Sequence, residues 1–238
     1  MVDLNVRLLF RIRENNLPTI EEQLKALWLL AKHLENIDLP MEIWHPAAPT
    51  PQESLSLGAF HESGPTDEVI SLAKSNNHDM PDYPSVGVAN GVDGSGGIWF
   101  TSSLNLSAIS SFDLVAIDIY KLFSFSGVAH LIEELVKIYP ALCIEAGPYK
   151  YFSDENQVFP DRPGVGWMLY LPHVFTPAQI PEARTLIPVM RDGQQQGTII
   201  VSVTGEVFDV NNRDHVKTAN DIEIRLADQD LLPRYVDL

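Results

Sequence analysis

Residues 4–37 read LNVRLLFRIRENNLPTIEEQLKALWLLAKHLENI, and this stretch decides the fold class. Its first nine residues largely alternate between apolar and polar side chains, which is the period of two that a half-buried β-strand shows. Thr19 can then cap a helix, because Glu22 follows three residues later and completes a capping box. Apolar residues recur at helical spacing to the end of the stretch. The pattern predicts a strand followed by a helix that packs on it.

The rest of the chain alternates between strand and helix signals. Strands are expected at residues 86–89, 98–102, 112–120, 141–146, 165–171, 183–190 and 197–203. Helices are expected from the cap Thr66 to Ala73, from the cap Ser126 to Ile138, and from a cap at Asn211 or Asn212 to Leu226. Loops are expected at the Pro- and Ser-rich residues 40–66, anchored by Trp44, and at 147–163, and a turn at Asp192-Gly193.

This order predicts an α+β protein with a mixed, largely antiparallel sheet, or sheets, flanked by three main helices. We expect residues 1–238 to form a single domain. Two α/β lobes that share a sheet are the alternative, with a boundary near residues 121–126.

The bulk composition is that of a globular protein, with 45% hydrophobic and 20% charged residues. No run of about 18 apolar residues is present, so no membrane span is expected. The first residues lack the apolar core of a signal peptide. Cys143 is the only cysteine, which excludes an internal disulfide and a cysteine-based zinc site. Its neighbours are apolar, so we expect it to be buried in a soluble, cytoplasmic protein.

The charge balance is the most unusual bulk property, with 32 acidic residues against 16 basic ones and a formal net charge of −16. This balance disfavours direct binding to nucleic acid or to anionic membranes, since both need a basic surface. Residues 41–120 hold ten acidic residues and one basic residue, Lys74. They predict a surface for a basic protein partner, or else a solvated face whose interleaved aromatic residues form core: Trp44, Phe60, Tyr83 and Trp99.

No set of residues in the chain has the spacing of a known catalytic motif. The chain has no Gly-x-Ser-x-Gly elbow, no dinucleotide-binding glycine pattern and no Walker motif. The best metal candidate is His78 with Asp79 and Asp82, although nearby prolines favour a turn in which the Asp side chains cap backbone amides. We therefore expect a protein that is not an enzyme and has no cofactor and no bound metal.

Three segments together resemble the immunity protein 52 family. They are the strand and helix that lead into IDLPMEIWHP at residues 37–46, NGVDGSGGIWF at residues 90–100, and VGWMLYLP at residues 165–172. Members of that family neutralise toxins of bacterial polymorphic toxin systems, including effectors delivered by type VI secretion. The matching toxins are typically nucleases of the restriction-endonuclease-like class. The resemblance implies a cytoplasmic antitoxin with no active site of its own.

The leading hypothesis is an immunity protein that binds and inhibits a cognate nuclease toxin, either at the toxin's active site or by blocking its assembly. A nuclease must present a basic surface to phosphate, and carboxylates suit such a surface. The alternatives are a metal-assisted hydrolase using His78, Asp79 and Asp82, and a non-enzymatic adaptor. The residues expected to contact the toxin are Glu62, Asp67, Glu68, Asp79, Asp82 and Asp93, with Trp99 as an aromatic anchor.

Overall fold

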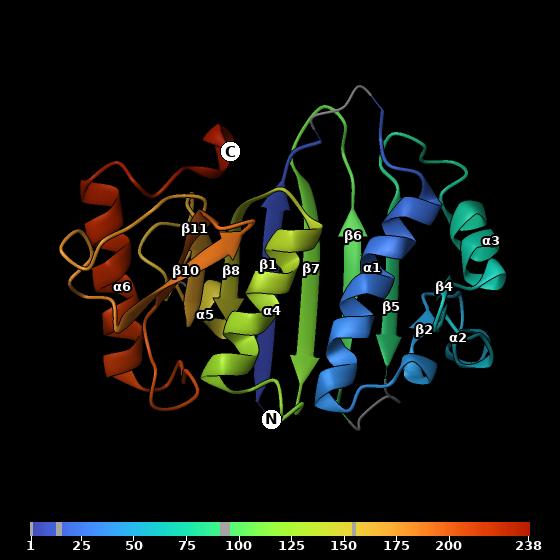
Figure 1. Cartoon of the computed structure of the whole chain (residues 1–238), viewed down its shortest axis with the longest axis horizontal. Coiled ribbons are helices and arrows are strands. Elements are labelled where there is room, and N and C mark those ends of the chain that lie inside the picture. The colour runs from blue at the N-terminus through green and yellow to red at the C-terminus, as the bar shows by residue number, and fades with distance from the viewer. Residues whose placement is uncertain (1, 13–15, 91–95, 154–155) are drawn as a thin grey trace. The chain divides into compact units, whose positions relative to one another are not determined.

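The computed structural model describes residues 2–12, 16–90, 96–153 and 156–238, and it confirms the α+β class (Figure 1). The chain divides into two compact units. The terminal unit comprises Met1–Phe10 and Tyr120–Leu238, and the middle unit comprises Arg11–Ile119. Among the described residues, no helix combines the length and the apolar character that crossing a membrane requires.

The strands of the middle unit follow the order β7-β6-β5-β2, and every pair in this order is antiparallel. Their bounds are β2 (His45–Pro46), β5 (Ser85–Asn90), β6 (Gly97–Ser103) and β7 (Ser110–Ile117). A separate small hairpin pairs β3 (Phe60–His61) with β4 (Gly64–Pro65). The helices are α1 (Ile20–Leu34), α2 (Pro51–Ser56) and α3 (Asp67–Asn76), with single 3-10 turns at Glu35–Ile37 and Met41–Ile43.

The predicted capping box starts α1. The Thr19 hydroxyl accepts the N–H of Glu22 at 3.2 Å, and the Glu22 carboxylate accepts the N–H of Thr19 at 2.8 Å. The helix lies across β5 and β6 (Figure 1), so the prediction that it packs on the strand that precedes it is wrong. Four residues of the predicted apolar stripe are buried, Leu24, Leu27, Ala31 and Leu34, whereas Ile20, Trp28 and Ile37 are half-buried.

The segment 40–66 is more structured than the predicted loop. Thr50 caps α2 by accepting the N–H of Glu53 at 3.2 Å, and Pro51 occupies the first turn, where its missing N–H has no cost. Trp44 is fully buried as predicted, with its ring centroid 4.9 Å from that of Phe100. Of the prolines that suggested a loop, Pro51 begins a helix, and Pro46 and Pro65 lie in the short strands β2 and β4.

The strands of the terminal unit follow the order β10-β11-β9-β8-β1, again with antiparallel neighbours. They are β1 (Asp3–Phe10), β8 (Ala141–Gly147), β9 (Met168–Leu171), β10 (Thr185–Arg191) and β11 (Gln194–Val201). The helices are α4 (Phe125–Ile138), α5 (Tyr149–Ser153) and α6 (Arg213–Asp228), followed by the 3-10 helix η3 (Tyr235–Asp237). The first strand pairs with a distant partner, since Val6 lies opposite Ala146.

Two predictions in this unit were wrong in detail. Ser124, not Ser126, caps α4, because Ser124 has the extended backbone of a cap and its hydroxyl accepts the N–H of Gly127 at 3.0 Å. The expected loop at 147–163 contains α5. The predicted turn at Asp192-Gly193 is confirmed, with positive φ at both residues, and β11 starts directly after it.

Candidate functional site

Five of the predicted partner-binding carboxylates lie exposed around α3 of the middle unit. Asp67 and Glu68 occupy the first turn of α3, and Glu62 lies in the turn between β3 and β4. Asp79 and Asp82 follow the other end of the helix. Ten residues of helix span about 15 Å, so these five carboxylates, the acidic band, flank both ends of α3 rather than forming one point.

The acidic band lacks compensating cations. Within the part of the chain that the structure describes, none of its five carboxylates has an ion-pair or hydrogen-bond partner. Lys74, the one basic residue of 41–120, forms an ion pair with Glu21 of α1 instead. Within the described residues, no cation therefore offsets the negative charge of the band.

The loop after α3 is fixed by Asn77 rather than by aspartates. The buried Asn77 amide donates to the carbonyls of Ala73 at 2.8 Å and Ser85 at 2.9 Å, and its oxygen accepts the N–H of Ser85 at 2.7 Å. The prediction that Asp79 and Asp82 cap backbone amides is therefore wrong. Both side chains are exposed to solvent and available for other contacts.

The loop is not arranged as a metal site. Among the described residues, which include His78, Asp79 and Asp82, no group of three or more His, Cys, Asp or Glu side chains is placed to hold a metal ion. The backbone instead makes consecutive turns, in which the N–H of Met80 bonds the carbonyl of Asn77 at 3.2 Å. The structure gives the hydrolase alternative no ligand set at these three residues.

The aromatic residues of this region divide between core and surface. Trp44 and Phe60 are buried, whereas Tyr83 is 56% and Trp99 is 41% exposed. Trp99 alternates along β6 with buried residues that face α1, so its ring lies on the opposite face of the sheet. The structure therefore does not place Trp99 with the acidic band. Tyr83, next to Asp82 in the chain, is the exposed aromatic that it places there, while Asp93 falls outside the described residues.

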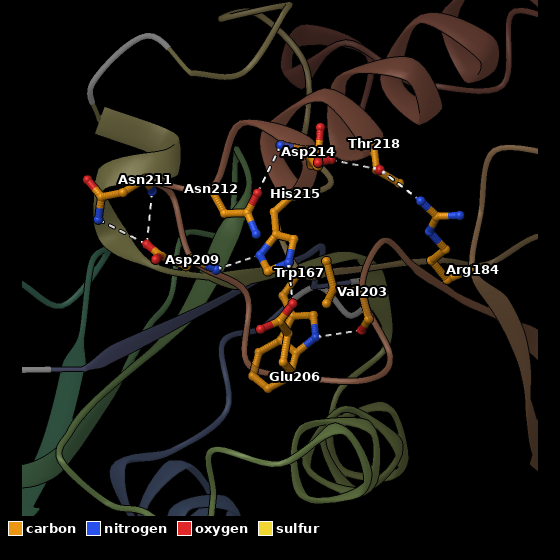
Figure 2. Close-up of polar contacts among 10 residues, drawn as sticks. All are labelled: Trp167, Arg184, Val203, Glu206, Asp209, Asn211, Asn212, Asp214, His215 and Thr218. Atoms are coloured by element: carbon orange, nitrogen blue, oxygen red, sulfur yellow. Dashed lines mark hydrogen bonds and ion pairs between the residues drawn. The ribbon is translucent and has the colours of Figure 1, made fainter.

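A polar cluster of the terminal unit surrounds His215 at the start of α6 (Figure 2). The ring Nδ1 accepts the N–H of Asp209 at 3.0 Å, so the proton of a neutral ring lies on Nε2, which is 3.1 Å from the carboxylate of Glu206. Both ring nitrogens are thus occupied, and neither has a free lone pair to take a proton from a substrate.

The same cluster borders a surface pocket of about 300 Å³, and its hydrogen bonds join groups of the protein to one another. Asn212 caps α6 by accepting the N–H of Asp214 at 3.0 Å, and the indole of Trp167 donates to the carbonyl of Val203 at 2.9 Å. These contacts fix the segment between β11 and α6 (Figure 2). His215 was not predicted as a site residue. It lies four residues before the buried Ala219, so the two share one face of α6.

Two buried glutamates were also missed. Glu145 lies in the apolar run LCIEAG of β8, and Glu223 lies on α6 among the buried Ala219, Ile222 and Leu226. In the sequence, such a residue can be recognised as a glutamate within an apolar strand or within the apolar stripe of a helix. It indicates a site with compensating partners, because burying a carboxylate without them is costly. Both glutamates have such partners.

Comparison with known proteins yields a fold likeness alone. No family model matches the chain, and no curated protein is similar to it in sequence. Among solved structures, the Pseudomonas aeruginosa T6SS protein PA0821 is similar, with a TM-score of 0.50 and 12% sequence identity. The match covers 93% of this chain and 74% of that one. At this identity the likeness shows a shared fold and carries no statement about activity.

Proposed function

We propose that this chain is an immunity protein that binds and neutralises a cognate bacterial toxin through the acidic band of the middle unit. The observation that carries the proposal is that five exposed carboxylates flank α3 without cation partners among the described residues, while Lys74 pairs with Glu21. An uncompensated field of this kind accelerates encounter with a basic protein. In this proposal the chain has no catalytic role and acts in the cytoplasm.

The partner class that fits best is a nuclease. Its active-site groove must be basic to hold a phosphate backbone, and carboxylates can occupy that groove in place of phosphates. The three segments that resemble the immunity protein 52 family would imply this partner class, although no family model matches the chain. The fold likeness to a protein described as belonging to a T6SS, a type VI secretion system, favours delivery of the toxin by such a system.

Binding to a purified toxin encoded by a neighbouring gene tests the proposal. The double variant Asp79→Lys/Asp82→Lys should weaken binding at least tenfold at low salt, and its affinity should depend less steeply on salt than that of the natural chain. The matched control is Asp228→Lys/Asp237→Lys, which makes the same charge change at exposed residues of the terminal unit.

The two variants separate the possible outcomes. Loss of affinity in the first variant with little change in the control supports docking at the band. Equal losses would show that only net charge matters and would remove the band from the proposal. A toxin that the natural chain neither binds nor neutralises in co-expressing cells would contradict the immunity function itself.

A further inference from the structure

Residues 78–83 form a loop that joins α3 to β5, and every one of them is exposed. Buried residues hold both ends of this loop. Asn77, which precedes it, is fixed by its three side-chain hydrogen bonds. The buried Pro84 follows it, and its carbonyl accepts the N–H of Leu104 at 2.9 Å. The loop is therefore held in place by the core of the middle unit.

Two large apolar side chains of this loop, Met80 and Tyr83, face solvent. Met80 is 57% and Tyr83 is 56% exposed. They lie at the two ends of one turn, because the N–H of Tyr83 donates to the carbonyl of Met80 at 3.1 Å. Such a turn keeps the Cα atoms of its end residues within about 7 Å of each other. Met80 and Tyr83, the apolar pair, are therefore presented together on one fixed turn.

Carboxylates alternate with the apolar pair along the loop. Asp79 precedes Met80, Asp82 precedes Tyr83, and both aspartates are exposed. Among the described residues, neither aspartate has an ion-pair or hydrogen-bond partner. A single exposed apolar residue is ordinary on a protein surface. A methionine and an aromatic ring together, beside charged groups, have the composition of an interface core with its polar rim.

The charge around the apolar pair selects the kind of partner. A second copy of this chain would bring the same aspartates against Asp79 and Asp82, and like charges repel. Nucleic acid and anionic membranes are repelled in the same way. A basic protein is attracted. Arginine suits the loop best, because a guanidinium can stack on the ring of Tyr83 while it bonds the carboxylate of Asp82.

We propose that Met80 and Tyr83 anchor the toxin by filling an apolar pocket that arginine side chains surround on the toxin's surface. This inference rests on the function proposed above and gives the two parts of the surface different roles. The carboxylates of the acidic band act mainly on the rate of association, as charges on a rim do. The apolar pair sets the rate of dissociation, because a few desolvated anchors carry most of the binding free energy of an interface.

Binding kinetics of the full chain with the purified toxin of a neighbouring gene test these roles. Surface plasmon resonance at several salt concentrations measures both rates. Met80→Ala/Tyr83→Ala should raise the dissociation rate about tenfold or more and change the association rate by less than about twofold, because every charge of the loop is kept. Asp79→Lys/Asp82→Lys should chiefly lower the association rate and its dependence on salt.

Two further variants serve as controls. Met190→Ala/Tyr120→Ala removes the same two kinds of side chain from the terminal unit, where Met190 is 50% and Tyr120 is 76% exposed, and should bind like the natural chain. Met80→Leu/Tyr83→Phe keeps the apolar volume and the ring, and its dissociation rate should stay within about threefold of the natural value.

The outcomes separate the anchor from the proposed function. If the natural chain binds the toxin and Met80→Ala/Tyr83→Ala dissociates no faster, the anchor is overturned and docking at the acidic band stands. Equally fast dissociation of the terminal-unit control would also overturn the anchor, because the loss would not be specific to the loop. A natural chain that does not bind the toxin would overturn both the anchor and the immunity function.

Methionine oxidation of the natural chain covers the case in which a variant fails to fold. Hydrogen peroxide transfers one oxygen atom to an exposed thioether, which becomes the sulfoxide, and is itself reduced to water. Met80 should oxidise roughly fivefold or more slowly in the complex with the toxin than in the free chain, while Met190 keeps its rate. Mass spectrometry of the peptides measures both. Equal oxidation of Met80 in the free and the bound chain would overturn the anchor.

Discussion

The indole N–H of Trp28 on α1 donates a hydrogen bond of 2.9 Å to the carbonyl of His61. This bond ties the β3–β4 hairpin, which carries Glu62 of the acidic band, to the central helix of the middle unit. The same ring faces the ammonium of Lys32, 5.1 Å from its centroid. The position of Glu62 therefore depends on Trp28, which lies outside residues 41–120.

Replacing Trp28 by Phe should remove that hydrogen bond while keeping an aromatic ring against the helix. We expect the free energy of unfolding to fall by about 1 kcal/mol, the usual net contribution of one hydrogen bond. Urea denaturation followed by circular dichroism measures the change. Trp99→Phe is the matched control, and because Trp99 is 41% exposed, it should change stability by less than about 0.5 kcal/mol.

Replacing Lys74 by Met should strengthen attraction to a basic partner. The ion pair with Glu21 is largely exposed, so its loss should change stability little. The net charge becomes more negative next to the acidic band, and the association rate with the proposed toxin should rise at low salt. Stopped-flow association kinetics would reveal this. A rate that stays the same, or that rises equally at high salt, would argue against electrostatic steering at α3.

Replacing Asn77 by Ala should destabilise the loop that carries Asp79 and Asp82. Three hydrogen bonds are lost at a buried side chain, and the carbonyl and the N–H of Ser85 lose this partner, while the carbonyl of Ala73 still accepts the backbone N–H of residue 77. We expect a loss of roughly 2–3 kcal/mol in the free energy of unfolding. Thermal denaturation checks this value. Ser75→Ala, an exposed change in the same helix, should leave the midpoint nearly unchanged.

The pH dependence of stability should carry the sign of a raised carboxyl pKa. Glu145 titrates at about 7 in the folded chain and at about 4.3 when unfolded, so the folded state binds more protons between these values. Its contribution is full below pH 4.3 and is lost as the pH rises through 7, with a slope approaching about 1.4 kcal/mol per pH unit. Urea denaturation at successive pH values should show a smaller decline for Glu145→Gln. An equal decline in both chains would contradict the assignment.

Local patterns predicted much of the fold. The box of Thr19 and Glu22, the cap at Thr66 and the turn at Asp192-Gly193 are all determined by a few neighbouring residues, and all are present. The α4 cap was misplaced by two residues because Ser124 and Ser126 both satisfy the same local rule.

The candidate site was less predictable, because it depends on which residues meet in space. Composition located the acidic residues of 41–120, but only the structure of β6 shows that Trp99 lies on the face of the sheet opposite α1. In the sequence, Asn77 looks like an ordinary turn residue. Its role depends on the hydrogen bond from the N–H of Ser85, which forms only in the folded chain. Glu145 and Glu223 lie far apart in the chain, and the backbone amides of Gly164 and Val165, which bond one glutamate each, give no local signal.

The pairing of β1 with β8 also constrains the order in which the chain can fold during synthesis. Asn5 lies opposite Gly147, so the first strand emerges from the ribosome long before its partner. The whole of the middle unit, residues 11–119, is made in that interval and has its own core. A growing chain can therefore complete the middle unit before β8 has been made. A nascent molecule halted before β8 would already present the acidic band while its terminal unit was still unformed.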